Sequence, residues 1–371
     1  MINGVNIIGP VFGEFGIGED VRSLAHALLH LNVDINIIEY PKKGNFSKAR
    51  YSLERFCSND FKYRINIFCI PIFEIFRFVS EYGFSNFDNK FNIGYSPWEL
   101  ETWPRQFKFM TSYLDEVWAS SSHTFNAYSK SLDTPVYLVP LIVEPFGQNG
   151  LPELKSNSGI DKSKFNFLYV FDSNSTYARK NPHDVVKAFK KSFLRNPEVS
   201  LVLKTMNYQF DDAQLNIDLK DASNITLINE CLSRGELFAL YKACDAYISL
   251  HKAEGFGRTI AEAMLLQKPV IVSNYSGNTD FCTSDTAFLV EGKLQKIDAY
   301  EYHFWHQNKW FFSELDSAAS QMLECFENTK LRSLRVQNAY KLISESFSIE
   351  SVARKIRLRL INIQRKMNLF D

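Results

Sequence analysis

Residues 251–264 read HKAEGFGRTIAEAM, and this stretch indicates the fold class because a strand is predicted just before it and a helix within it. The apolar run 246–250 is typical of a buried strand, and 259–266 has the spacing of an amphipathic helix. A further apolar run, 269–273, predicts the next strand. A strand, a glycine-rich turn, a helix and a second strand make the repeating unit of a parallel α/β sheet.

The same alternation extends toward the N-terminal side of this stretch. Apolar runs at 165–171, 199–204 and 225–228 predict strands, and the patterns at 182–194 and 234–242 predict helices between them. We therefore expect a doubly wound α/β domain over residues 160–345. Open parallel sheets bind ligands at the carboxyl ends of their strands, so functional residues are expected in the loops that follow strands.

The first half of the chain repeats this organisation. Five strands are predicted there, at 5–8, 33–38, 66–70, 91–94 and 116–119. A glycine-rich turn at 13–18 leads from the first strand into a helical pattern. Between 140 and 164 the periodicity stops, and proline, glycine and serine accumulate as in a linker. The sequence thus predicts two Rossmann-like doubly wound domains, 1–150 and 160–345, facing each other across a ligand cleft.

The C-terminal segment, residues 346–371, is basic and amphipathic. Its apolar residues have helical spacing: Ile349, Ala353, Ile356, Leu360, Ile363 and Met367. Residues 330–371 include ten Lys or Arg and three Asp or Glu, a charge of +7, so the rest of the neutral chain carries −7. Two interpretations stay open for the basic residues: a solvated helix face, or contact with an anionic membrane surface.

Composition limits the class of protein and its partners. With 45% apolar and 23% charged residues, the chain has the composition of a globular protein that buries a sizeable core. Lys and Arg together number 42, and so do Asp and Glu, so no overall basic field is available for a nucleic acid. We expect no nucleic-acid partner.

Cysteine spacing and apolar runs predict a cytoplasmic protein. The six cysteines form no C-x-x-C pair, which fits free thiols in a reducing compartment. Residues 1–9 lack the charged and apolar regions of a secretory signal. The longest apolar run, 65–79, is interrupted by Glu74 and Arg77 and is shorter than the ~20 residues of a membrane-spanning helix.

Residues 251–264 also carry the strongest chemical signal in the chain. At the start of the predicted helix, the backbone amides of Gly255, Phe256 and Gly257 suit a phosphate, because a helix N-terminus favours negative charge. Glu254 and Glu262 stand seven intervening residues apart, so they can contact different ends of one elongated ligand. A carboxylate that accepts two hydroxyl hydrogen bonds is suited to a ribose or a sugar. The alternative is a capped helix with two solvated glutamates.

These residues carry a resemblance to a known family. The run from Glu254 through Met264, then residues 268–271 (KPVI) and 276–278 (SGN), resembles the donor-site signature of the retaining glycosyltransferases of family four, with its two glutamates. The resemblance implies the GT-B fold, two Rossmann-like domains with the active site between them. It also implies that the last helix crosses back to the first domain. In such an enzyme Glu254 binds the hydroxyls of the donor sugar and Glu262 holds the ribose.

The loop after the first strand of the second domain holds an adjacent basic pair, Arg179 and Lys180. A guanidinium and an ammonium just before a helix suit a diphosphate, and basic residues of this loop hold the donor diphosphate in the resembled family. The family often spaces its Arg and Lys several residues apart, so which of the two dominates stays open. The alternative is a solvated basic pair.

Other candidates are weaker signals. Gly16 and Gly18 lie in the loop that meets the donor phosphates in the resembled family, and Glu99, beside Trp98, resembles the segment that faces the transferred sugar. Core packing is the alternative for this tryptophan. His251 stands just before the glutamate motif and can bond a sugar or phosphate oxygen.

Further along the chain, Asn278 belongs to the resembled signature, while His303 and His306 lie in an aromatic stretch and fit packing or a cleft rim. No D-x-D motif is placed to serve a diphosphate, so we expect no metal and no cofactor besides the nucleotide-sugar co-substrate.

The functional hypothesis follows from the resemblance. It predicts a retaining, metal-independent hexosyl-type transferase that moves a sugar from a UDP- or GDP-linked donor to a hydroxyl of a glycan or lipid-linked acceptor. Members of the resembled family build bacterial cell-surface polysaccharides at the inner face of the membrane. The alternative is a non-catalytic partner subunit that binds the sugar nucleotide within a glycosyltransferase complex.

Overall fold

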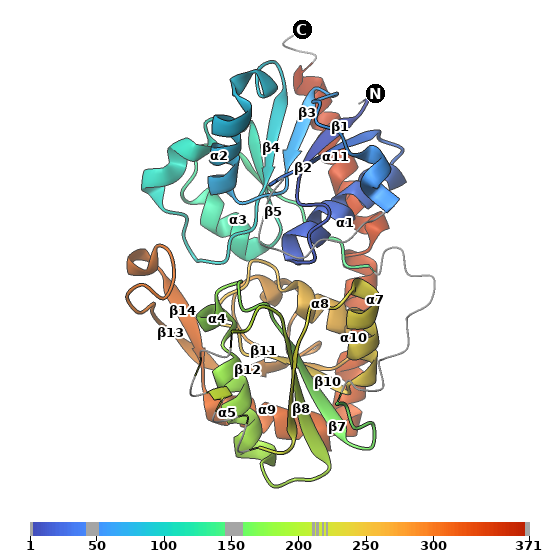
Figure 1. Ribbon diagram of the computed structural model, residues 1–371, viewed down its shortest axis with the longest axis vertical. Coiled ribbons are helices and arrows are strands. Elements are labelled where there is room, and N and C mark those ends of the chain that lie inside the picture. The colour runs from blue at the N-terminus through green and yellow to red at the C-terminus, as the bar shows by residue number, and fades with distance from the viewer. Residues whose placement is uncertain are drawn as a thin grey trace. The chain divides into compact units, whose positions relative to one another are not determined.

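The protein is described here from a computed structural model, which describes residues 3–41, 52–144, 159–209, 212, 215–216, 219 and 222–367 (Figure 1). The chain divides into two compact units. The first comprises Met1–Glu144 with Glu345–Asp371, and the second comprises Pro145–Ser344. The division falls inside the predicted linker 140–164, of which residues 145–158 lie outside the described residues.

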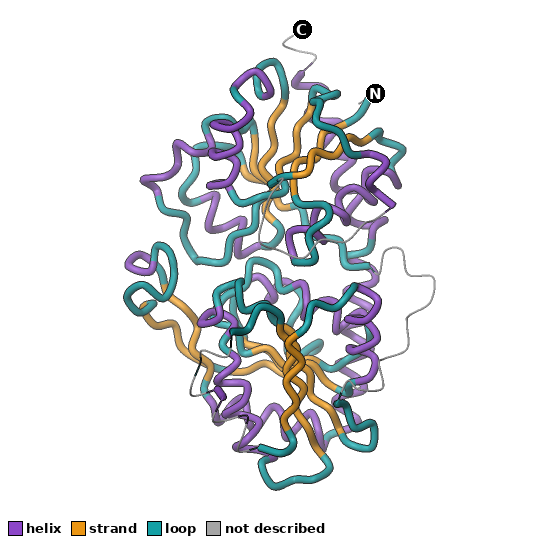
Figure 2. The backbone as a smooth tube through the Cα atoms, viewed as in Figure 1, coloured by secondary structure: helices purple, strands orange, loops and turns teal. Residues whose placement is uncertain are grey.

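The first unit contains a parallel six-stranded sheet in the order β2-β1-β3-β4-β5-β6 (Figure 2). Its strands are β1 (Val5–Gly9), β2 (Ile35–Glu39), β3 (Ile65–Phe68), β4 (Phe91–Tyr95), β5 (Glu116–Ala119) and β6 (Val136–Leu138). The connecting helices are α1 (Gly16–His30), α2 (Ile72–Tyr82) and α3 (Ser122–Ser129). Strands β1 to β5 are largely buried, whereas β6 is partly exposed.

A ladder of buried asparagines fixes the register of this sheet. The second residue of each of four neighbouring strands is an asparagine, and the residues pair in register: Asn36, Asn6, Asn66 and Asn92. Their side-chain amides donate along the row, from Asn36 to Asn6 (3.1 Å), from Asn6 to Asn66 (2.9 Å) and from Asn66 to Asn92 (2.8 Å). A slip of one residue would leave these buried amides unpaired, so the ladder selects one register.

The C-terminal helix α11 (Ile349–Met367) belongs to the first unit and packs beside α1, as the red and blue helices of Figure 1 show. Its buried residues are Val352, Ala353, Ile356, Leu360 and Ile363. The apolar stripe predicted from the sequence is therefore largely used for packing. One of the flanking basic residues, Arg359, is also drawn in, where its Nε donates to Glu116 Oε1 at 2.8 Å.

The second unit contains another parallel six-stranded sheet, in the order β12-β11-β10-β7-β8-β9. Its strands are β7 (Phe165–Val170), β8 (Val199–Thr205), β9 (Ile225–Asn229), β10 (Ala246–Ser249), β11 (Val270–Ser273) and β12 (Phe288–Val290). The helices include α4 (Tyr177–Lys180), α5 (Pro182–Phe193), α7 (Arg234–Ala243), α8 (Arg258–Leu265), α9 (Leu315–Glu327) and α10 (Thr329–Ser346). Strand order reverses between β7 and β10, and such a switch point is where open α/β sheets bind ligands.

The expectation of two doubly wound α/β sheets is confirmed, and each predicted strand is present within about two residues of its expected ends. Among the described strands, the three-residue strands β6 and β12 and an antiparallel hairpin of β13 (Gly292–Lys296) and β14 (Lys309–Ser313) were not predicted. The helices α9 and α10 were not predicted either. Within the described residues, no helix is both long and apolar enough to cross a membrane.

Candidate functional site

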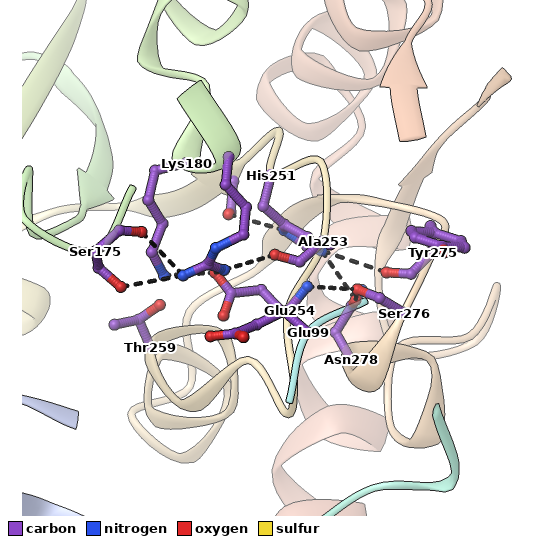
Figure 3. Close-up of polar contacts among 12 residues, drawn as sticks. Glu99, Ser175, Lys180, His251, Ala253, Glu254, Thr259, Tyr275, Ser276 and Asn278 are labelled. Carbon is purple, nitrogen blue, oxygen red and sulfur yellow. Dashed lines mark hydrogen bonds and ion pairs between the residues drawn. The ribbon is translucent and has the colours of Figure 1, made fainter. Parts of the chain in front are cut away.

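Two loops of the second unit meet because β7 and β10 are neighbours in the sheet. The loop after β7 leads into α4, and the loop after β10 leads into α8. The backbone amide of Lys252 donates to the carbonyl of Arg179 at 2.8 Å, and Asn181 Nδ2 donates to the carbonyl of Leu250 at 2.9 Å. Lys180 and Glu254 therefore lie in one cluster (Figure 3), and Arg179 contacts the same glutamate.

Glu254 lies at the centre of this cluster. Its Oε1 is 2.5 Å from Lys180 Nζ and 3.3 Å from Arg179 Nη1. Burial raises the pKa of the Glu254 carboxyl, but the two cations outweigh burial and hold the pKa at about 2. The group is a carboxylate at neutral pH, and it can only accept hydrogen bonds.

The two basic residues differ in what they offer to a ligand. The Arg179 side chain is 2% exposed, and its guanidinium donates to the carbonyl of Ala253 (2.7 Å) and to the carbonyl and hydroxyl of Ser175 (3.0 Å each). Arg179 thereby ties the loop after β7 to the loop after β10. The ammonium of Lys180 is more accessible, with 15% of its side chain exposed. The geometry favours Lys180 as the cation that meets a ligand and Arg179 as the residue that holds the loops.

The backbone around the glutamate is held from the loop after β11. The amide of Glu254 donates to Ser276 Oγ at 2.8 Å, and the amide of Gly277 donates to the Glu254 carbonyl at 2.9 Å. A Cβ on Gly277 would lie 2.2 Å from the carbonyl oxygen of Gly255, so only glycine fits there. Gly257 precedes α8 with a φ of +91°, a conformation that favours glycine.

Side-chain burial limits the predicted roles of three further residues. His251 is fully buried, where its Nδ1 pairs with Ser249 Oγ (3.0 Å) and its Nε2 with Asn278 Oδ1 (3.0 Å). Burial lowers the pKa of His251, which favours the neutral ring. Asn278 is also fully buried and donates to the carbonyl of Ser273. Both side chains are therefore occupied by hydrogen bonds inside the protein and are not exposed to solvent. The Phe256 side chain is also buried, so only the backbone of this residue is available to a ligand.

Glu262 is held differently from Glu254. It lies in α8 with its side chain 2% exposed and is 2.8 Å from Arg234 Nη2. Arg234 begins α7, and its guanidinium lies 4.5 Å from the ring centroid of Phe238. The alternative of a solvated glutamate is therefore wrong at this position. Sequence reasoning missed Arg234, although its place directly after a strand-following loop was a usable signal.

The two glycines of the first unit have different surroundings. A Cβ on Gly18 would lie 2.1 Å from the carbonyl oxygen of Gly13, so close packing of α1 on its loop already explains this glycine. Nothing lies within 4 Å of a Cβ on Gly16, which is exposed at the start of α1. The loop itself is held by Arg22, whose Nη1 donates to the carbonyls of Val11 (2.8 Å) and Gly13 (2.9 Å).

The two candidate residues in the segment after β4, Trp98 and Glu99, differ in burial. Trp98 is buried, with its ring centroid 4.6 Å from that of Trp103, so the packing interpretation holds for this tryptophan. Glu99 is half-buried, and its carbonyl lies 2.9 Å from His123 Nε2. In the described part of the chain, no three His, Cys, Asp or Glu side chains are grouped so as to hold a metal ion.

Comparison with known proteins agrees with this architecture. Residues 152–301 match the model of a family described as glycosyl transferases group 1. That stretch contains the loops after β7, β10 and β11. The matched residues therefore include the whole Glu254 cluster.

Several solved structures share the fold over 96–100% of this chain. Sucrose-phosphate synthase from Thermosynechococcus elongatus has a TM-score of 0.68 at 13% identity, covering 100% of both chains. HepE of Anabaena, solved with UDP-glucose, has a TM-score of 0.66 at 13% identity over 96% of this chain and 99% of its own. The pneumococcal O-GlcNAc transferase GtfA, solved with UDP and GlcNAc, has 0.64 at 11% identity over 98% and 99%. The fold is GT-B, with two Rossmann-like domains.

Proposed function

We propose that this protein is a retaining glycosyltransferase of family four. It moves a hexosyl-type sugar from a UDP- or GDP-linked donor to a hydroxyl of a glycan or lipid-linked acceptor, in the synthesis of bacterial surface polysaccharide. The observation that carries the proposal is the Glu254–Lys180 pair at the carboxyl edge of the second sheet. It lies at the switch point where such sheets bind ligands, within the stretch that matches the glycosyltransferase family.

In the proposed donor site, Lys180 interacts with the diphosphate and Glu254 interacts with the sugar. Negative charge grows on the leaving diphosphate, and preorganised positive groups there accelerate the reaction. Lys180 and the N-terminus of α8 supply that charge, so the proposed reaction needs no metal ion. The Glu254 carboxylate accepts hydrogen bonds from the hydroxyls of the donor sugar, while Glu262, oriented by Arg234, accepts those of the ribose.

Retention of configuration at the anomeric carbon is explained if the acceptor hydroxyl attacks from the same face that the diphosphate leaves. The bond between the anomeric carbon and the diphosphate oxygen breaks, and the acceptor oxygen forms its bond on the same face. The acceptor proton passes to the leaving phosphate oxygen, so the step requires no protein base. A covalent intermediate on a carboxylate is the competing route. The UDP-bound structures of similar fold support uridine as one candidate base of the donor.

A nucleotide-binding panel tests the donor assignment. UDP, GDP, ADP and dTDP, alone and as their glucose or mannose derivatives, are added to the full chain, and thermal unfolding is followed. A nucleotide at 100 times its Kd stabilises the chain by about 2.7 kcal/mol. We expect one base to stabilise the wild type, and Glu262→Gln and Lys180→Met to lose the effect. Lys187→Met replaces an exposed lysine of α5 and is the matched control.

Turnover separates the enzyme from a binding subunit. Nucleoside diphosphate release from the preferred donor is measured with and without mono- and oligosaccharide acceptors, in the presence and absence of EDTA. Release that depends on acceptor and is unaffected by EDTA supports a metal-independent transferase. Binding without release under all conditions identifies the non-catalytic partner subunit instead. If none of the nucleotides binds at millimolar concentration, the proposed function is wrong.

Peripheral contact with an anionic membrane from the cytoplasmic side is part of the same proposal. The outward face of α11 exposes Leu358 (60%) and Ile361 (40%), with exposed Arg354, Arg357 and Arg365 around them. An apolar pair within a basic face suits the headgroup region of an anionic bilayer. We expect the protein to float with phosphatidylglycerol vesicles and not with phosphatidylcholine vesicles. Leu358→Ser should weaken flotation, and unchanged flotation would contradict the proposal.

A further inference from the structure

The β13–β14 hairpin is an addition to the doubly wound sheet of the second unit. It lies between β12 and α9 in the chain, forms its own antiparallel pair and extends away from the six-stranded sheet, in orange in Figure 1. The residues that match the glycosyltransferase family end at 301, inside the hairpin. The rest of the tip and β14 therefore lie outside the matched stretch.

The tip of the hairpin, residues 297–308, has a buried aromatic contact at its base and exposed aromatic rings on its surface. Tyr302 is buried, with its ring centroid 5.4 Å from that of the fully buried Trp310. Tyr300 is 90% exposed, and its ring centroid lies 5.7 Å from that of the partly exposed Trp305. Tyrosine and tryptophan combine a large apolar ring with a polar group and are enriched at interaction surfaces.

The backbone of the tip holds two aromatic residues in an uncommon conformation. Tyr300 has a φ of +69° and Phe304 a φ of +59°, in the left-handed region that bulky residues rarely adopt. Such conformations cost free energy and are concentrated at functional sites. Here the left-handed turn at Tyr300 accompanies the most exposed ring of the tip.

The base of the hairpin is joined to the loops of the candidate donor site. The amide of Phe311 donates to the carbonyl of Lys252 at 3.0 Å. The Lys252 ammonium lies 5.0 Å from the ring centroid of Trp310 and 4.6 Å from that of Phe312. Tyr275 stacks on Phe311, with centroids 5.6 Å apart and planes 9° from parallel. The loops after β10 and β11 thus hold both the donor-site glutamate and the hairpin, which fixes the tip relative to the site.

The charge of the hairpin favours no anionic ligand. The tip contains Asp298 and Glu301, and the two strands add Lys293, Lys296 and Lys309, so residues 292–313 carry +1. A nearly balanced surface of this kind gives no strong attraction to an anionic lipid surface or a polyphosphate. Exposed aromatic rings offer flat apolar faces, which match the C–H faces of neutral pyranose rings.

We propose that Tyr300 and Trp305 form a binding platform for neutral sugar rings of the acceptor glycan. This inference rests on the proposed function and specifies its acceptor side. The platform holds the glycan at a distance from the reacting hydroxyl, so it contributes acceptor affinity and leaves donor binding unchanged.

The test measures saccharide and nucleotide binding separately, on the full chain. Binding to immobilised maltohexaose, cellohexaose and mannohexaose is compared with binding to a polygalacturonate hexamer. We expect the wild type to bind a neutral hexasaccharide, and Tyr300→Ala and Trp305→Ala each to weaken that binding about tenfold. Tyr340→Ala removes a tyrosine of α10 that is 41% exposed and is the matched control. The thermal shift with UDP or GDP should be the same in all four proteins.

The outcomes distinguish the platform from the donor site. Nucleotide binding without binding of any neutral hexasaccharide overturns the platform and leaves the proposed donor function intact. Saccharide binding without nucleotide binding overturns the proposed function. Equal saccharide affinity in the wild type and Tyr300→Ala overturns the platform. Binding to phosphatidylglycerol vesicles that Tyr300→Ala abolishes would assign the tip to lipid and also overturn it.

Discussion

Ser276 provides a test of the loop that positions Glu254. Its φ of +76° and ψ of −150° lie in a region that is essentially reserved for glycine, and a serine there costs about 1–3 kcal/mol. Its hydroxyl oxygen accepts a hydrogen bond from the backbone amide of Glu254 at 2.8 Å. Leaving that amide without a partner costs about 1–3 kcal/mol. Ser276→Ala loses the hydrogen bond and keeps the backbone strain. Ser276→Gly loses the same bond but releases the strain.

The difference between the two variants isolates the strain. Glycine also gains freedom in the unfolded chain, which lowers stability by about 0.4–1 kcal/mol relative to alanine. When this entropic cost of glycine is subtracted from the strain that glycine releases, the Ser276→Gly variant should be about 1 kcal/mol more stable than Ser276→Ala. Ser320, exposed in the middle of α9, is the control. In a helix interior the order reverses, and alanine is more stable than glycine by about 1 kcal/mol.

Hydrogen exchange in urea is the suitable assay because a chain with two units need not unfold in one transition. Exchange is followed at the buried amides of β10 and β11, which report the unit that contains both positions. If the Ser276→Ala variant is as stable as Ser276→Gly, or more stable, the backbone at Ser276 is not strained.

Three further predictions concern packing and charge. Gly18→Ala should lower stability by about 1–3 kcal/mol, because its Cβ meets a carbonyl oxygen at 2.1 Å, whereas Gly16→Ala meets nothing within 4 Å and should be neutral or stabilising in thermal unfolding. Glu116→Gln leaves the Arg359 guanidinium without its buried carboxylate and should cost about 3 kcal/mol in urea unfolding of the first unit; a loss under about 1 kcal/mol contradicts this. The pKa of Glu254 is lowered in the folded chain from 4.5 to about 2, so its charge stabilises the fold above pH 4.5, and this contribution is lost as the pH falls from 4.5 toward 2. The stability difference between the wild type and Glu254→Gln should shrink over that range, and a constant difference would exclude the linkage.

Local sequence patterns predicted the two sheets because each buried strand is a short apolar run bounded by turn residues. The hairpin escaped prediction because β13, Gly292–Lys296, is polar and mostly exposed and has no alternating apolar face. The three-residue strands β6 and β12 are too short for a periodic signal. In each case the strand is defined by its partner rather than by its own residues.

The amino-acid sequence alone predicts the α/β class, Glu254 in the loop before a helix with Glu262 inside that helix, and the basic pair after a strand. Which of these groups contact one another depends on the tertiary fold. Lys180 and Glu254 are 74 residues apart, and they pair because the sheet places β7 beside β10. The same packing buries His251 and brings Arg234 to Glu262. Local patterns fix the type of each element, whereas burial and ion pairing depend on contacts between elements distant in the chain.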